Sequence, residues 1–241
     1  MNNKLYHECY GHVCQARSLL QNLQACGFDT VAPLHEKTDV LEEGIELSAN
    51  AGMTLEELKG DVEKCRRCSL AESRSNIVFA RGNPEAGLVF VGEAPGLEED
   101  RQGLPFVGEA GRLLDRILFA MGLSGEDVYI CNLIKCRPPG NRNPDSEEVA
   151  ACRPYLERQL GLLEPQVIVT LGRFAAQSLL GVQTPVSRLR GSWHEYQGVA
   201  VLPTFHPAYL LRTPAAKKLV WDDMKQVKQR LMLRIGNSTK Q

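Results

Sequence analysis

Short apolar runs alternate with helical patterns along most of the chain. Four runs of four or five residues carry apolar side chains at nearly every position, over 88–91, 128–131, 167–171 and 199–202. Runs this uniformly apolar are typical of parallel strands that are buried on both faces. Because helical stretches separate them, we predict an α/β fold in which a central parallel sheet lies between two layers of helices, a three-layer α/β/α sandwich.

Helices are indicated by apolar stripes and by capping sequences. Four of them are expected between or after the strands: over 113–121, from a cap at 145–148, over 175–180 and over 220–231. Pro154 is expected to kink the second of these. A fifth helix is expected to begin at Thr54, because Thr54-Leu55-Glu56-Glu57 has the capping-box form, and to lead into Cys65.

Composition divides the chain into three parts. Residues 1–53 carry three cysteines and an acidic run, and we expect them to form a partly helical N-terminal extension. Residues 54–233 hold the alternating strands and helices and form the main domain, and 234–241 are expected to be a disordered tail. In the extension, Cys9 and Cys14 with their flanking histidines match no strong ligand spacing, which favours incidental thiols over a metal site.

The bulk composition narrows the class of protein. Among 241 residues 43% are apolar and 24% are charged, and no apolar run approaches the roughly 18 residues that cross a bilayer. The N-terminus has neither the basic start nor the apolar stretch of a secretory signal, so we expect a cytoplasmic protein with no membrane partner, and a monomer. Its eight cysteines are then reduced thiols or metal ligands rather than disulfides.

A net charge of -1 argues against a broadly basic surface that attracts nucleic acid at long range. Any nucleic-acid footprint must be local. Cations that could form one fall in three groups: Lys135, Arg137 and Arg142; Arg188 and Arg190; and Arg212, Lys217 and Lys218. For each of them an ordinary solvated charge is an equally good interpretation.

Four cysteines have the arrangement of metal ligands. Cys65 and Cys68 form a C-x-x-C pair at the expected end of a helix, and Cys136 and Cys152 follow from a loop and the next helix. Four thiolates suit zinc or a 4Fe-4S cluster equally, and their spacing does not choose. Cys131 is a rival ligand, but its place in an apolar strand favours a buried small hydrophobe. No strand precedes the C-x-x-C pair, which weakens a thioredoxin-like redox interpretation.

Unusual residues follow the expected strands, where ligands bind in layered α/β sheets. Glycines at 92, 96, 103 and 108 would let the backbone approach a ligand closely. Phe106 could stack on a planar heterocycle or fill the core. Asn132 could offer a donor and an acceptor to a pyrimidine edge or close a turn. The segment 206–212 places an imidazole before a proline-initiated turn with apolar residues and a cation, which could wedge into DNA.

Together the segments 92–96, 103–108, 132–139 and 206–212, with the four cysteines, resemble the iron-sulfur uracil-DNA glycosylases called family four. The resemblance covers about residues 54–230. It implies a four-stranded parallel sheet between helices and hydrolysis of the bond joining uracil to deoxyribose in single- or double-stranded DNA. It also implies a 4Fe-4S cluster, and so chooses iron over zinc, with these ligands: Cys65, Cys68, Cys136 and Cys152.

The chemistry of base excision assigns roles within this resemblance. A base in a duplex must be extruded before its glycosidic bond can be reached. Phe106 would then stack on the uracil, and Asn132 would bond to its O4 and N3-H, which rejects cytosine because cytosine presents the opposite donor and acceptor order. Charge develops as the bond breaks, so a donor is needed at uracil O2 and a carboxylate near the sugar. We choose His206 and Glu93, with Glu99 as a second candidate carboxylate unless it belongs to a solvated acidic turn.

The remaining expected contacts lie beside these residues. Gly92 and Ala94 would line the base pocket. The expected DNA contacts are Leu210, Leu211 and Arg212 as a wedge, with Arg137 and Arg190. Other uracil glycosylases carry an aspartate at the position of Ala94, so catalysis by that group is impossible here and its role is transferred to Glu93. The covalent uracil-binding branch has a basic, histidine-containing insertion near the first motif, whereas here Gln102-Gly103 runs directly into Leu104, so we expect turnover.

Two other classes of function are compatible with the residues. One is a binding module that grips uracil or damaged DNA without cleaving it, with the cluster as sensor or scaffold. The other is a redox or zinc protein that is indifferent to nucleic acid. Our hypothesis for the cluster is structural: it holds the loop of Asn132 and Arg137 against the helix that bears Cys152.

Overall fold

A six-stranded mixed sheet forms the centre of the domain in the computed structural model, which describes residues 52–238 and the side chains of 52–232. Its strand order is β1-β3-β2-β4-β6-β5, with β3, β2, β4 and β6 parallel and both edge strands antiparallel. The strands are β1 Ala80–Gly82, β2 Leu88–Gly92, β3 Tyr129–Asn132, β4 Val167–Leu171, β5 His194–Tyr196 and β6 Val199–Thr204.

The four predicted strands are the four parallel ones, and every residue of β2, β3 and β4 is buried. The two edge strands were not predicted. Each has three residues, and their sequences, Ala-Arg-Gly and His-Glu-Tyr, contain no apolar run. Partly exposed polar strands of this kind protect the edges of a sheet but leave no periodic signal in the sequence.

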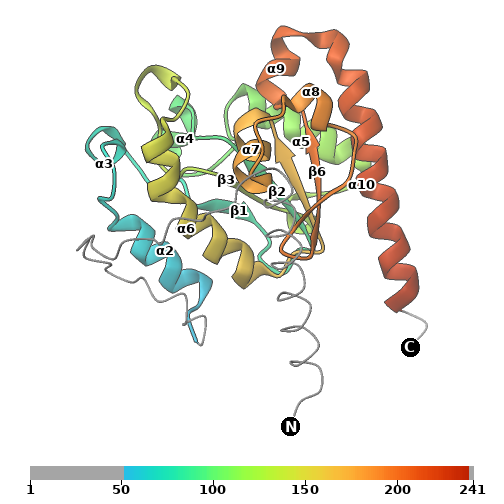
Figure 1. Cartoon of the computed structure of the whole chain (residues 1–241), viewed down its shortest axis with the longest axis horizontal. Helices are drawn as coiled ribbons and strands as arrows, with labels where there is room; N and C mark the ends of the chain where they lie inside the picture. Colours follow the sequence, from blue (N-terminus) through green and yellow to red (C-terminus); the bar gives the residue numbers. More distant parts are fainter. Residues whose placement is uncertain (1–51, 239–241) are drawn as a thin grey trace, which may run out of the picture. The chain divides into compact units, whose positions relative to one another are not determined.

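Helices cover both faces of the sheet (Figure 1). The helices are α2 Leu55–Glu63, α3 Leu70–Ser73, α4 Leu97–Gln102, α5 Glu109–Met121, α6 Ser146–Leu163, α7 Arg173–Leu180, α8 Val186–Leu189, α9 Pro207–Arg212 and α10 Lys217–Ser238. Three single-turn helices join them: η1 Gly125–Asp127, η2 Pro139–Asn141 and η3 Pro214–Ala216.

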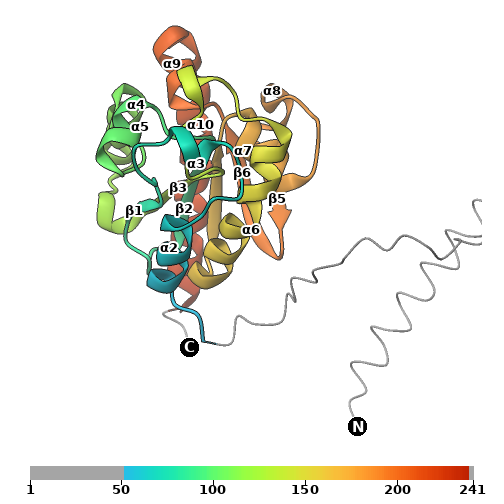
Figure 2. The same cartoon turned by 90° about the vertical axis from the view of Figure 1, so that its left-hand side faces the viewer.

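Alternate strand residues feed two separate cores. Phe90 and Val169 point to one face, where they pack with side chains of α5, α9 and α10. Val91 and Ile168 point to the other face and pack with α3, α6 and α7. The two layers lie on opposite sides of the strands in Figure 2. Full burial of one such aliphatic side chain stabilises the fold by about 1.5–3 kcal/mol, so the two cores hold the strand ends in fixed positions.

Several predictions about the helices can be compared with the structure. Thr54 caps α2 with the predicted capping box, and Gly122 ends α5 in the left-handed conformation with φ 78°. Helix α6 contains Pro154 and continues past it to Leu163. Helix α10 runs to Ser238, so residues 234–238 of the expected disordered tail are helical.

The predicted N-terminal extension lies outside the described residues, except for its last two positions. Among residues 52–238, no helix has both the length and the apolar character that a bilayer span requires.

Candidate active site and cysteine cluster

A cleft of about 530 Å³ opens at the carboxyl ends of the parallel strands. Glu93 and Ala94 enter it directly after β2, Asn132 from the end of β3, and His206 from the residue before α9. Phe106 reaches it from the loop between α4 and α5. Because β2 pairs with β3 in the sheet, Glu93, Ala94 and Asn132 lie in one site although they are far apart in the sequence.

Asn132 is the most deeply buried polar group of the cleft. Its side chain is 1% exposed, and Oδ1 has no hydrogen-bond partner among the residues that the structure describes. A buried carbonyl oxygen without a partner is destabilising by about 1–3 kcal/mol, so such groups are rare away from sites that bind a ligand. Gly92 makes room for it, because a Cβ at Gly92 would overlap both Asn132 Oδ1 and the Phe106 ring.

Phe106 is held in a strained backbone conformation. Its φ is 56°, in the left-handed region that a bulky residue rarely adopts. Helix α5 packs directly against its main chain, since a Cβ at Gly111 would overlap the Phe106 carbonyl. The Phe106 ring lies 5.6 Å from the His206 ring, centroid to centroid, with 29° between their planes. The Phe106 ring is therefore held in place by the protein itself, without a ligand.

Glu99 is a positioning residue of this loop and not a free acid. Its carboxylate accepts hydrogen bonds from the backbone amides of Val107 at 2.9 Å, Gly108 at 2.8 Å and Gly96 at 3.1 Å. The side chain is 9% exposed. The alternative of a solvated acidic turn is wrong, because the carboxylate is buried and both of its oxygens tie the Phe106 loop to the start of α4.

His206 is neutral and has one defined tautomer. Burial, together with the nearby Arg212 cation, lowers its pKa to about 4. Its Nδ1 accepts a hydrogen bond from the Ala208 amide at 3.1 Å. In a neutral imidazole the other nitrogen then carries the proton, so Nε2-H is available as a donor.

Glu93 lies half-buried at the end of β2. Burial raises the pKa of its carboxyl to about 7, and the positive charge of Arg173 opposes that rise. A carboxyl group that titrates near neutral pH is suited to exchange protons during a reaction. Ala94, beside it, leaves the cleft without a second carboxylate at this point.

The expected DNA contacts divide into surface and interior residues. Leu211, 39% exposed, and Arg212 line the outer part of the cleft. Leu210 is completely buried in the core, so its assignment to the DNA wedge is wrong for this conformation. Arg137 is partly exposed, and its Nε donates to Asn141 Oδ1 at 2.7 Å.

Two cations of the expected footprint are internal. Arg190 is 16% exposed and forms a two-pronged ion pair with Asp223, with its Nη2 also donating to Leu219 O at 2.6 Å. Lys135 is completely buried. Lys135 is therefore not available to DNA, and Arg190 is held by Asp223 with only a small part of its side chain exposed.

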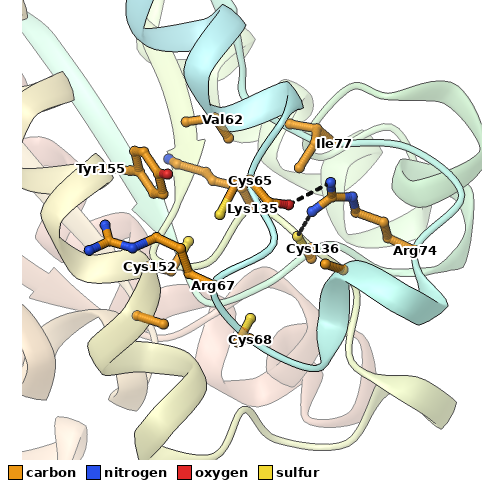
Figure 3. Close-up of a pocket in the computed structure, with 12 residues that line it drawn as sticks. Val62, Cys65, Arg67, Cys68, Arg74, Ile77, Lys135, Cys136, Cys152 and Tyr155 are labelled. Atoms are coloured by element: carbon orange, nitrogen blue, oxygen red, sulfur yellow. Dashed lines mark hydrogen bonds between the residues drawn. The ribbon is translucent and has the colours of Figure 1, made fainter.

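The four predicted cysteine ligands line a single small cavity of about 10 Å³ (Figure 3). Cys65 and Cys68 come from the segment between α2 and α3, Cys136 from the loop after β3, and Cys152 from α6. Cys131 is buried within β3 and does not line this cavity, as expected. Burial raises the pKa of the Cys136 thiol and raises that of Cys152 to about 11, so thiolates here need a cation or metal partner.

The surroundings of the cavity fit a negatively charged group. Among the described side chains, no three His, Cys, Asp or Glu groups lie close enough to hold one metal ion. Zinc would require four sulfurs about 3.8 Å apart, from Zn-S distances of about 2.3 Å in a tetrahedron. Arg74 donates to Cys136 Sγ at 3.2 Å and to the Cys65 carbonyl at 2.9 Å, which suits a negatively charged group (Figure 3).

Sequence reasoning missed residues whose function depends on the fold. Arg74, Gly111 and Arg173 acquire their roles only through contacts with distant segments. For Arg74, a cation six positions after the C-x-x-C pair was the available signal. Asn141 and Asn143 also line the cleft from the loop after β3, where the proline-rich sequence indicated a turn and nothing more.

Known proteins resemble this chain over the same region. A type-4 uracil-DNA glycosylase of Saccharolobus solfataricus is 42% identical over 186 residues, covering 73% of this chain and 86% of that protein. One of Archaeoglobus fulgidus is 44% identical over 182 residues, covering 72% and 92%. One of Thermotoga maritima is 45% identical over 171 residues, covering 69% and 89%. The model of the uracil-DNA glycosylase superfamily matches residues 79–225. This range contains every cleft residue described above, whereas Arg74 and the C-x-x-C pair of the cysteine cavity precede it. With its layered fold and its cleft at the strand ends, this chain belongs to the uracil-DNA glycosylase superfamily.

Proposed function

We propose that the protein is a DNA-repair glycosylase that extrudes uracil from DNA and hydrolyses the bond between the base and deoxyribose. The products are free uracil and an abasic site. The observation that carries this proposal is the unpartnered, buried Oδ1 of Asn132, which faces a cleft that also holds a fixed aromatic ring and a neutral imidazole donor. Type-4 uracil-DNA glycosylases more than 40% identical over most of the chain support it.

Recognition of the base follows from the Asn132 carboxamide. Oδ1 would accept a hydrogen bond from uracil N3-H, and Nδ2 would donate to uracil O4. Cytosine has an acceptor at N3 and a donor at C4, so both contacts would be lost and Oδ1 would stay unpaired in a buried place. Phe106, whose ring is held in place by its strained loop, would stack on the uracil ring.

Bond cleavage uses a hydrogen-bond donor, His206, and a carboxylate, Glu93. The C1′-N1 bond breaks with its electron pair passing to uracil N1, and the charge that spreads to O2 is stabilised by the Nε2-H of His206. Water supplies the oxygen that bonds to C1′, and Glu93 takes its proton. As a carboxylate, Glu93 also stabilises the positive charge that develops on the sugar.

DNA binding is local in this proposal. Leu211 and Arg212 lie exposed on α9 beside the cleft, where an apolar side chain could fill the space left by the extruded base. Extrusion from a duplex costs a few kcal/mol and is less costly from a single strand, so both forms of DNA are substrates. Arg137 supplies a further phosphate contact.

We infer that the four cysteines hold a 4Fe-4S cluster. Such a cluster, when bound, would supply a covalent cross-link among the segment after α2, the loop after β3 and α6. The residues around it fit this role, because Arg74 already ties the first two of these segments together through the Cys65 carbonyl and Cys136 Sγ. The cluster is structural in this proposal, and the chemistry of the cleft proceeds without it.

A direct experiment tests the activity. Purified protein is incubated with a uracil-containing oligonucleotide and a matched thymine-containing one, and alkali then cuts any abasic site. We expect cleavage at uracil only. Glu93→Gln should bind the uracil strand normally but release base about 10²–10⁴-fold more slowly. A wild-type protein that binds uracil strands and never releases base would instead favour the non-cleaving binding module.

A further inference from the structure

A fully buried lysine lies between the base-reading asparagine and the cysteine cavity. Lys135 is 0% exposed, and its Nζ donates to the Asn132 carbonyl at 2.8 Å and to Gln159 Oε1 at 2.5 Å. Gln159, itself completely buried, donates onward to the Tyr129 hydroxyl at 2.8 Å. The chain of hydrogen bonds therefore starts at the main chain of the recognition residue and ends on helix α6 and strand β3.

The charge of this lysine is not balanced by a carboxylate. Within residues 52–232, no Asp or Glu oxygen forms an ion pair with Lys135 Nζ. The Phe79 ring, 5.6 Å from Nζ, supplies only a weak attraction. A buried ammonium without a counter-charge is destabilising by several kcal/mol. A negative group beside the cavity would offset that cost.

The cysteine cavity provides that group. Lys135 lines the same cavity as Cys65, Cys136 and Cys152 (Figure 3). Four cysteine thiolates that bind iron and sulfide carry net negative charge in a setting of low polarity, where an opposite charge acts strongly. Arg74 on the other side already donates to Cys136 Sγ at 3.2 Å.

We propose that Lys135 is the internal counter-charge of the metal-bound cysteines and, through the same ammonium group, a positioning residue for Asn132. The inference rests on the proposed uracil excision and on the cysteine-held cluster. It makes the two sites interdependent: the cluster stabilises the buried ammonium, and the ammonium fixes the end of β3 from which Asn132 reads uracil. Lys135 touches neither base nor sugar.

The test compares three variants of the full-length iron-loaded protein. Lys135→Met removes the charge and keeps a similar shape. Gln159→Leu keeps the charge but removes one of the two acceptors that orient Nζ. Lys64→Met is the matched control, because Lys64 is exposed and directly precedes Cys65. The measurements are iron and sulfide per chain, the rate at which a chelator bleaches the absorption near 400 nm, the cluster's reduction potential, and KM and kcat on a uracil oligonucleotide.

For Lys135→Met we expect the cluster to be lost to chelator about 10- to 100-fold faster, the effect usual for a partner of metal ligands. The reduction potential should fall, since a positive charge that favours the added electron is gone. KM should rise about tenfold, because the Asn132 carbonyl loses its hydrogen bond from Lys135 Nζ and the asparagine is held less firmly. For Gln159→Leu we expect wild-type cluster retention with a raised KM. Lys64→Met should match wild type in every measurement.

The counter-charge role is overturned if Lys135→Met retains iron and potential as Lys64→Met does. The positioning role is overturned if KM in both Lys135→Met and Gln159→Leu equals the wild-type value. If Lys135→Met yields no folded protein, Lys135→Arg replaces it: retained iron with raised KM supports the inference, and lost iron despite the kept charge contradicts it. A wild-type protein that holds iron but releases no uracil removes the proposed function alone, because the iron measurements still decide the counter-charge role.

Discussion

The Ala208 amide donates a hydrogen bond to Nδ1 of His206 at 3.1 Å, and this contact determines which ring nitrogen can donate a proton to the substrate. Pro207 fixes the turn that brings the amide back to the ring, so the arrangement is built from three consecutive residues. It leaves Nε2-H as the donor toward the cleft and keeps the charge of the site low, because the pKa of His206 is about 4.

Replacing His206 by Ala should slow base release about 10²–10³-fold, the usual effect of losing a donor to a developing negative charge. KM should change little, because the contact strengthens only as the bond breaks. Single-turnover rates on a uracil oligonucleotide measure this. Equal losses in binding and in rate would show that His206 merely shapes the pocket.

The pH dependence of kcat/KM should show one ascending limb near pH 7. Glu93 must be ionised to accept the proton of water, and burial raises its pKa to about 7. His206, with a pKa of about 4, is already neutral throughout the range from 5 to 9 and adds no limb there. A limb near 6.5 that disappears in a His206 variant would contradict the neutral imidazole.

Arg173→Met should move that limb to higher pH. The positive charge of Arg173 favours the Glu93 carboxylate, and its removal leaves desolvation unopposed, so the pKa of Glu93 rises further. At pH 9 the variant and the wild type should have similar activity, while at pH 6.5 the variant should be slower. A uniform loss at all pH values would mean that Arg173 acts on DNA binding instead.

Glu93 should also make the folded protein less stable as pH rises. Its pKa is about 7 when folded and 4.5 in the unfolded chain, so the folded state binds more protons between these values. The contribution is present below pH 4.5 and is lost as pH rises through 7. Glu93→Gln should therefore raise Tm relative to wild type at pH 8 and have no such advantage at pH 4.5. Thermal denaturation of both proteins at the two pH values checks the sign.

Much of this fold could be predicted from the sequence, because buried parallel strands are short and uniformly apolar. The four central strands and the cap of α2 were found in this way. The edge strands were missed, since a strand such as Ala80–Gly82 depends on pairing with β3 and has no pattern of its own. An element that has its own periodic pattern of apolar residues can be predicted from the sequence. A strand that forms only because it pairs with a neighbouring strand cannot.

The site shows the same division. Phe106, Asn132 and His206 were predictable because each stands at a strand end or between glycines, next to a recognisable motif. Lys135 and Arg190 were predicted to lie on a DNA-facing surface because a cation is normally solvated, but the structure buries Lys135 completely and pairs Arg190 with Asp223. Burial of a charge depends on what the rest of the fold places around it, so local sequence cannot reveal it.

Glu99→Gln tests whether that carboxylate positions the Phe106 loop. The substitution keeps the size of the side chain but replaces one of its two acceptor oxygens by a donor, so at least one of the amide bonds from Gly96, Val107 and Gly108 must weaken. Loss of one charge-assisted bond should lower stability by about 1.5–3 kcal/mol and raise KM. The ascending pH limb should stay near 7, because Glu93 still sets it. A limb that vanishes in Glu99→Gln would identify Glu99 as the titrating carboxyl.

Cys136→Ala tests whether the cluster is structural. Cys136 lies in the loop that follows β3, and its sulfur receives a hydrogen bond from Arg74, so the substitution removes a metal ligand and leaves that guanidinium without its sulfur partner. We expect loss of the absorption near 400 nm and little folded protein, because three segments lose their common cross-link. Ser73→Ala, an exposed change at the end of α3, is the control and should behave as wild type. A soluble, iron-free Cys136→Ala protein with full uracil release would show that the cross-link is dispensable and that packing around Arg74 suffices.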